Sequence, residues 1–235
     1  MIINENRRRK LEELEKAIGY TFKDKGILNT ALTHSSHAHE HRPKMQHNER
    51  LEFLGDTVLN MVISEYLYLN YPQLSEGRLT KARAVIVSEA SLADAARRIN
   101  LGRYILLGRG EENSGGRNRD SILADALESI IAAVYLDGGL EHARTFVLNS
   151  LGQGISEVMQ GRGLKDYKTD LQEILQQSSY DHIEYRIVKD SGPDHDKIFY
   201  AQVFHGNRLI GEGTGRSKKE AEQQAAQNAL KDMQK

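Results

Sequence analysis

Hydrophobic positions recur at helical spacing through the first 160 residues of the chain. Apolar residues three or four positions apart indicate amphipathic helices. They predict helices over residues 7–18, 23–33, 48–69, 75–99, 121–136 and 141–159. Almost no alternating, strand-like pattern interrupts them, so residues 1–160 are predicted to form an all-α domain.

The pattern changes after residues 161–164, which are predicted to be a short flexible linker. Residues 166–177 have helical spacing, and alternating apolar residues then predict three strands. The strands are expected at 182–189, 197–205 and 208–213, and a last helix follows Ser217. Residues 165–235 are therefore predicted to form a small α+β domain with the order α-β-β-β-α.

The helix at 48–69 combines acidic and large apolar residues. Glu49, Glu52 and Asp56 are three and four positions apart, so their carboxylates follow one stripe. Like charges at this spacing destabilise a helix by roughly 0.2–0.5 kcal/mol per pair, which a bound cation would offset. The alternative is a solvated acidic face, but neighbouring Leu, Phe and Val residues favour partial burial, which is costly for an unpaired carboxylate.

A second acidic pair, Asp125 and Glu128, lies inside the strongly apolar helix at 121–136. Together with Glu52 and Asp56, it provides the carboxylate oxygens that Mg²⁺ and Mn²⁺ prefer. Two such ions can activate water and stabilise the leaving oxygen of a phosphodiester. The pattern therefore favours metal-assisted phosphodiester hydrolysis.

The α+β domain has features of an anion-binding module. Ser217 and Glu220 have the spacing of a capping box, so a helix begins there with free backbone N–H groups. Lys218 and Lys219 add positive charge at the same place, which favours a phosphate. The alternative is an ordinary solvated helix start.

Three further residues are candidates for contact with RNA. Gln172 and Gln176 are one helical turn apart and can hydrogen-bond to sugar hydroxyls or base edges, and His195 lies in a turn that can reach a second groove. No run of exposed aromatic residues is present, which disfavours stacking on single-stranded nucleic acid.

Composition limits the remaining possibilities. The net charge is −1, so a nucleic-acid partner has to use a local basic patch. The chain has no cysteine, which restricts metal ligands to Asp, Glu and His and suits a reducing cytoplasm. Neither an apolar run of about 18 residues nor a secretory signal is present, so no membrane association is expected.

Five of the nine histidines lie between His34 and His47. A zinc or nickel site is one interpretation of this segment. A polar loop before the acidic helix is the other, and it is favoured because the charged neighbours and Pro43 provide no rigid frame for ligands. Residues 108–120 are likewise predicted to be a loop, and they lack the Gly-Lys-Ser/Thr of a Walker phosphate loop.

Several motifs resemble the ribonuclease III family, and together they span essentially the whole chain. The acidic motifs are NERLEFLGD at 48–56, SEGRLT at 75–80 and LADALE at 123–128. The α+β domain resembles a double-stranded-RNA-binding domain through Gly192, Pro193 and His195 and through GEGTGRSKKEAE at 211–222. Such domains are often basic, whereas residues 165–235 contain 11 basic and 12 acidic residues.

The resemblance implies a cytoplasmic, Mg²⁺-dependent endonuclease that cuts both strands of double-stranded RNA, with Mn²⁺ as a substitute metal. The products would carry 5′-phosphates and short 3′ overhangs, and the substrates would be ribosomal, messenger and other structured RNA. A homodimer is expected, because a twofold axis places one acidic cluster against each strand. The implied residues are the metal ligands Glu52, Asp56, Asp125 and Glu128 (Asp56 and Glu128 being the most critical), the assisting acids Glu49 and Glu76, and the RNA-binding residues Gln172, Gln176, His195, Lys218 and Lys219.

Three other functions remain open at this stage. A non-catalytic binder of double-stranded RNA would use the same domains without cutting, although none of the four central acids is missing. A phosphohydrolase built on a His-Asp pair would depend on His195 and Asp196, which lie in a turn. A helical scaffold would leave the acids with a structural role only, which the position of Asp125 and Glu128 in an apolar helix argues against.

Overall fold

A computed structural model describes residues 3–41, 45–161, 167–176, 181–193 and 197–233. The chain divides into two compact units, residues 1–164 and 165–235. The first unit is helical and the second is α+β, which confirms the predicted fold class. The predicted domain boundaries, at 160 and 165, lie beside this division and stay a prediction.

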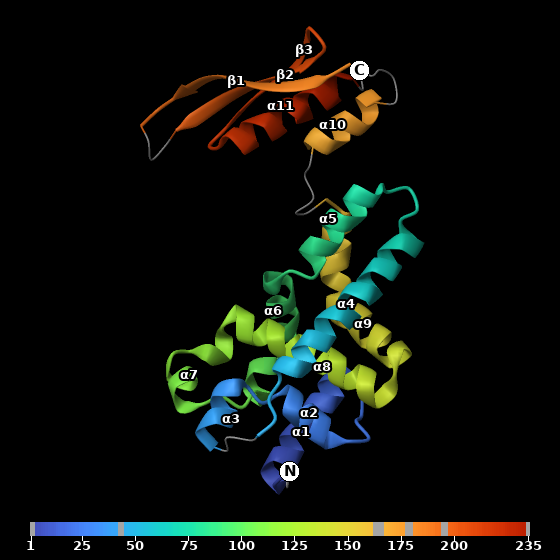
Figure 1. Ribbon diagram of the computed structural model, residues 1–235, viewed down its shortest axis with the longest axis vertical. Helices are drawn as coiled ribbons and strands as arrows, with labels where there is room; N and C mark the ends of the chain where they lie inside the picture. Colours follow the sequence, from blue (N-terminus) through green and yellow to red (C-terminus); the bar gives the residue numbers. More distant parts are fainter. Residues whose placement is uncertain (1–2, 42–44, 162–166, 177–180, 194–196, 234–235) are drawn as a thin grey trace. The chain divides into compact units, whose positions relative to one another are not determined.

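Among the described residues of the first unit, helices joined by short connections make up the structure (Figure 1). They are α1 (Glu5–Ile18), α2 (Lys25–Ala31), α3 (Ser35–His41), α4 (Glu49–Asn70), α5 (Glu76–Ile86), α6 (Glu89–Arg98), α7 (Arg109–Asn113), α8 (Asp120–Gly138) and α9 (Leu140–Met159), with short 3₁₀ turns η1 (Leu101–Tyr104) and η2 (Gly116–Asn118). No helix in the described ranges combines the length and the apolar character needed to cross a bilayer.

Two segments that the sequence predicted to be loops contain helix. They are α3, in the histidine-rich segment, and α7, within residues 108–120. Tertiary contacts explain the difference, since side chains of α3 satisfy the backbone at the start of α7. Ser36 Oγ accepts a hydrogen bond from Gly108 N, and Glu40 Oε2 accepts one from Arg109 N, both at 2.9 Å.

Helix α8 is the centre of the first unit, and its residues are buried on nearly all sides. Helix α4 packs closely across it (Figure 1). The closest approach is at Gly55, where an added Cβ would lie 1.9 Å from the carbonyl oxygen of Glu128. Only glycine therefore allows the two backbones to come so near.

Asn48 joins three segments instead of capping α4. Its backbone is already in the right-handed helical region, and its side chain makes no capping hydrogen bond, although asparagine is a residue type that often caps helices. The residue is buried; its N–H donates to Thr33 O at 2.9 Å, and its carbonyl accepts from Ser129 Oγ at 3.2 Å. The start of α4 is thus tied both to the end of the α2 segment and to α8.

The second unit is a three-stranded antiparallel sheet with both helices on one face (Figure 1). Its elements are α10 (Tyr167–Gln176), β1 (Ile183–Ser191), β2 (Ile198–His205), β3 (Arg208–Gly215) and α11 (Lys218–Met233). Two alternating residues of β2, Ala201 and Val203, are fully buried next to the alanines of α11, as expected of a strand with one covered face. Helix α11 lies so close to β3 that a Cβ on Gly213 would be 2.2 Å from Ala225 N.

Candidate active site and RNA-binding surface

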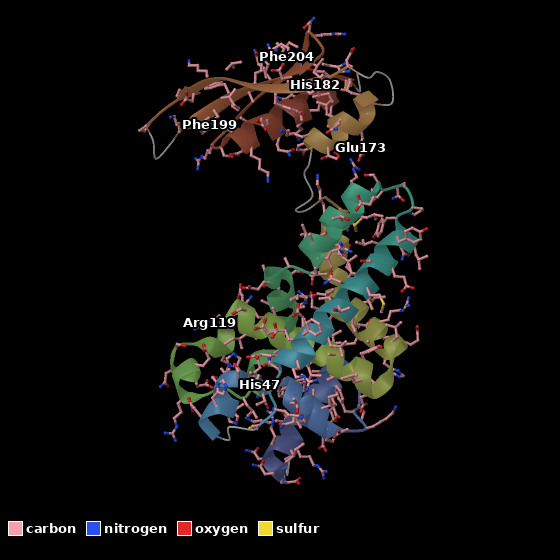
Figure 2. All side chains as sticks on the ribbon, viewed as in Figure 1. His47, Arg119, Glu173, His182, Phe199 and Phe204 are labelled. Atoms are coloured by element: carbon pink, nitrogen blue, oxygen red, sulfur yellow. The ribbon has the colours of Figure 1, made fainter. Side chains whose placement is uncertain are left out.

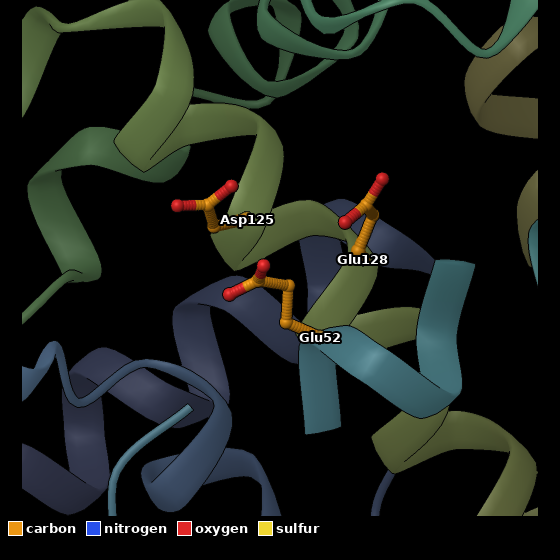
Figure 3. A group of neighbouring side chains, drawn as sticks. All are labelled: Glu52, Asp125 and Glu128. Atoms are coloured by element: carbon orange, nitrogen blue, oxygen red, sulfur yellow. The ribbon is translucent and has the colours of Figure 1, made fainter. Parts of the chain in front are cut away.

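Three carboxylates from the two packed helices meet at the α4–α8 crossing. They belong to Glu52 of α4 and to Asp125 and Glu128 of α8, and one oxygen of each lies within 4.8 Å of the others (Figure 3). Asp125 and Glu128 share a face because they are three positions apart on one helix. The contact at Gly55 brings Glu52 to the same place, since Gly55 is three residues further along α4.

The electrostatics of this cluster are unfavourable without a cation. In the part of the chain that the structure describes, no basic side chain forms an ion pair with Glu52, Asp125 or Glu128. Burial, followed by the charges of Asp56, Asp125 and Glu52, raises the pKa of Glu128 to about 8. Burial, followed by the charges of Glu52 and Glu89, raises the pKa of Asp125 to about 6.

The pKa of Glu52 is raised for the same two reasons, burial and neighbouring negative charge. Burial raises the pKa of its carboxyl group, with further contributions from the charges of Glu49 and Asp56. Half-buried carboxylates that repel one another suit a hard, oxygen-preferring cation such as Mg²⁺ or Mn²⁺. The chemistry of this donor set therefore fits the predicted metal.

The other predicted acids lie outside this group of three. Asp56 is exposed one turn along α4 and accepts a hydrogen bond from Asn60 Nδ2 at 2.8 Å, although its charge still acts on Glu52 and Glu128. Glu49 is exposed, with Oε2 at 3.9 Å from His47 Nδ1. Glu76 begins α5 and accepts from Thr80 Oγ1 of its own helix at 2.8 Å.

The histidine-rich segment shows no metal site among its described residues. The only described group of three or more potential ligands within mutual reach is the carboxylate cluster. His34 Nδ1 instead lies 2.8 Å from Ser36 Oγ, and His37 Nδ1 lies 3.2 Å from the carbonyl oxygen of Leu107. Burial lowers the pKa of His34, and the charges of His47 and Arg119, both labelled in Figure 2, act in the same direction.

In the second unit, Lys218 and Lys219 are exposed in the first turn of α11. Ser217 Oγ accepts the N–H of Glu220 at 3.2 Å, as a capping residue does. Glu220 reaches back as predicted, but its Oε2 accepts from Arg216 N at 2.8 Å instead of from Ser217 N. The helix start therefore presents two lysine ammonium groups to solvent.

The remaining predicted RNA contacts are only partly described. Gln172 is exposed on α10. Gln176 ends that helix, but its side chain lies outside the described residues, as does all of His195. Sequence reasoning missed a cation–aromatic pair on the sheet, where the Arg186 guanidinium lies 4.5 Å from the ring centre of Phe204, the residue labelled in Figure 2.

The raised pKa of Glu128 predicts a pH-dependent stability. Its ordinary value is 4.5 and its folded value is about 8, so between these pH values the folded protein binds more protons than the unfolded chain. Stability attributable to this group therefore falls as pH rises through that window. With chelator present, we expect the melting temperature of Glu128→Gln minus that of the wild type to increase from about pH 5 to about pH 8. A difference that stays constant with pH would contradict the shift.

Comparison with known proteins agrees with this geometry. The Ribonuclease-III-like family model matches residues 24–155, and the double-stranded RNA binding motif matches residues 167–233. Ribonuclease 3 of Caldanaerobacter subterraneus is 56% identical over 220 residues, covering 94% of this chain and 96% of that protein. Ribonuclease 3 of Desulforamulus reducens is 54% identical over 222 residues, covering 94% and 90%.

A solved structure of the nuclease domain of ribonuclease III from Campylobacter jejuni superposes with a TM-score of 0.57 at 47% identity. The superposed region covers 61% of this chain and 96% of the Campylobacter jejuni chain. An all-helical nuclease fold with clustered acids, followed by a double-stranded-RNA-binding domain, defines a class of endoribonuclease. The chain belongs to the ribonuclease III family, as its sequence motifs predicted.

Proposed function

We propose that this protein is a Mg²⁺-dependent endonuclease that cleaves both strands of double-stranded RNA by two-metal hydrolysis. The products carry 5′-phosphates and short 3′ overhangs, and the substrates are ribosomal, messenger and other structured RNA of the cytoplasm. The observation that carries the proposal is the gathering of Glu52, Asp125 and Glu128 at one point of a chain that also has a double-stranded-RNA-binding domain.

Each acid has a role that follows from its position. Glu128 and Asp125 project from a rigid, buried helix, which fixes the spacing of their oxygens. Glu52 completes the set from α4, and Asp56 adds a fourth, exposed carboxylate one turn away. Mg²⁺, or Mn²⁺ in its place, supplies activation of water and stabilisation of charge on the leaving oxygen when bound. Burial and the neighbouring carboxylates raise the pKa of Glu128 to about 8, and its deprotonated form would be the one that holds a metal ion.

Glu49 and Glu76 assist in this proposal at the edge of the site. Glu49 is one turn before Glu52, and its charge already acts on that carboxylate. Glu76 is exposed on a different helix, where it accepts a hydrogen bond from Thr80 of α5 itself. Its effect on the metal site is therefore less direct than that of Glu49.

A homodimer is supported by an apolar stripe on the exposed face of α4. Phe53, Met61 and Tyr68 are spaced by eight and seven residues, so they follow one side of the helix, and Phe53 is 79% exposed. Contiguous exposed apolar residues mark interaction surfaces. A second copy covering this stripe brings two acidic clusters to one duplex. Sedimentation equilibrium that gives a monomer mass at micromolar concentration would contradict this dimer.

The second unit provides the affinity for RNA through Lys218 and Lys219, with Gln172, Gln176 and His195 in supporting contacts. A basic residue that contacts a phosphate contributes about one unit to the salt dependence of binding. Lys218→Ala/Lys219→Ala should therefore weaken duplex binding and reduce the slope of log affinity against log salt by about two. Lys231→Ala, near the other end of α11, is the control and should leave both unchanged. An unchanged slope in the double variant would remove these lysines from the interface.

The proposed activity is tested by incubating end-labelled duplex RNA with Mg²⁺ or with chelator, beside a single-stranded control. Cutting of the duplex that depends on Mg²⁺ supports the proposal. Duplex binding without cutting, under every metal condition, would favour the alternative of a non-catalytic double-stranded-RNA-binding protein.

A further inference from the structure

A concave site on the first unit shares no lining residue with the acidic cluster. It is a pocket of about 550 Å³, which is within the usual size range of small-molecule sites. Its described lining consists of Asn4, Asn6, Arg7, Lys10, His37, Arg103, Ile105, Leu106, Leu107 and Arg117. Four of these side chains are cationic, and none of the described lining residues is acidic.

Arg7 places a desolvated charge beside the pocket. Its Nε donates to Asn29 Oδ1 at 2.7 Å and its Nη1 donates to Tyr104 O at 2.6 Å, while Nη2 is buried without a hydrogen-bond partner in the described structure. Burial, with the nearby charge of Arg117, lowers the pKa of Arg7 to about 10. The polar groups around Arg7 are neutral, so its positive charge is not compensated there.

Arg117 has a different role, because its charge is already neutralised. It pairs with Glu112, and its Nη1 donates to the carbonyl oxygens of Gly102 and Ile105. It holds the backbone of the 102–105 segment in place, next to Arg7. This fixed arrangement also positions Arg103, which projects from the same segment.

Lys10 and Arg103 are the cations that a ligand can reach. Both side chains are exposed, and neither forms an ion pair with any described residue. They come from α1 and from η1, so they approach the pocket from separate elements. Because like charges repel, such a convergence is unfavourable unless an anion offsets it.

We propose that this pocket binds a small phosphorylated molecule, whose phosphate is held by Lys10 and Arg103 above the buried charge of Arg7. Arginine and lysine are the side chains that proteins use for phosphate, and a doubly charged phosphate group matches two exposed cations and a third behind them. Ile105, Leu106 and Leu107 provide an apolar side against which the rest of the molecule packs. The site is separate from the metal cluster, so its occupation does not depend on the proposed nuclease activity.

The test is isothermal titration of the full-length protein with inorganic pyrophosphate, in buffer without divalent metal. We expect saturable one-to-one binding that Lys10→Ala/Arg103→Ala weakens at least tenfold. Arg8→Ala/Lys16→Ala is the matched control, since it removes one arginine and one lysine that are exposed on α1 and do not line the pocket. The control should change the dissociation constant less than twofold. An unchanged melting temperature establishes that each variant is folded.

Three results would overturn the proposal. One is the absence of saturable binding by the wild type at pyrophosphate concentrations below about 1 mM. Another is equal weakening in both double variants, which would indicate diffuse attraction to a basic surface. The third comes from a parallel titration with duplex RNA: if Lys10→Ala/Arg103→Ala loses RNA affinity and keeps pyrophosphate affinity, the pocket is an RNA contact.

Discussion

Replacing Glu128 by Gln should abolish cleavage of duplex RNA and leave RNA binding unchanged. Glutamine keeps the size of the side chain but cannot supply a charged oxygen to the cluster with Glu52 and Asp125. If that charge contributes about 4 kcal/mol to transition-state stabilisation through the bound metal, the cleavage rate falls by about 10³-fold. The measurement is single-turnover cleavage of a labelled duplex with saturating enzyme, beside a binding titration in chelator.

Glu13→Gln is the control for this substitution, because Glu13 is exposed on α1 and belongs to no acidic cluster. It should cleave at the wild-type rate. Wild-type cleavage by Glu128→Gln would remove Glu128 from the catalytic site. Loss of RNA binding in the same variant would instead point to a folding defect.

Replacing Gly55 by Ala should both destabilise the first unit and separate its acids. The added Cβ would meet the backbone carbonyl of Glu128 at 1.9 Å, and a backbone atom cannot rotate away as a side chain does. Overpacking of a buried contact costs about 1–3 kcal/mol, and occasionally more, because the helices have to move apart. Since α4 carries Glu52 and α8 carries Glu128, this movement also opens the cluster.

The effect is measured by denaturant unfolding and by the rise in melting temperature that Mg²⁺ produces. Gly152→Ala is the matched control: it lies mid-helix in α9, and nothing stands within 4 Å of its added Cβ. That variant should be as stable as the wild type or more so, because alanine favours the helix by up to about 1 kcal/mol. Equal stability of Gly55→Ala and wild type would show that the crossing of α4 and α8 can relax.

The shared face of Asp125 and Glu128 was predictable because their spacing follows from helix geometry alone. Residues three apart on α8 must share a face, and the apolar surroundings of Asp125 and Glu128 indicated burial. The relative depth of the acids was not predictable in this way. Glu52 and Asp56 follow the same stripe, yet only Glu52 lies with the pair from α8, since the crossing point of the helices decides which turn is covered.

The errors of the sequence prediction share a physical cause, which is contact with distant segments. Helix α3 and helix α7 support each other through Ser36 and Glu40, so neither is visible from its own residues. Asn48 shows the same influence, since its backbone hydrogen-bonds to Thr33 and Ser129 from two other segments. Gly55 carries a sequence signal of its own: a glycine inside a predicted helix, directly after Phe53 and Leu54, weakens the helix and so indicates a packing reason.

Each unit buries its own set of apolar side chains. The first core is formed entirely within residues 1–164 and the second within residues 165–235. During synthesis, a domain folds as a unit once its chain has emerged, and the N-terminal domain does so first. The helices that carry the acids can therefore assemble while the RNA-binding part is still being translated. A nascent chain would then hold a formed carboxylate cluster before it has gained its means of retaining a duplex.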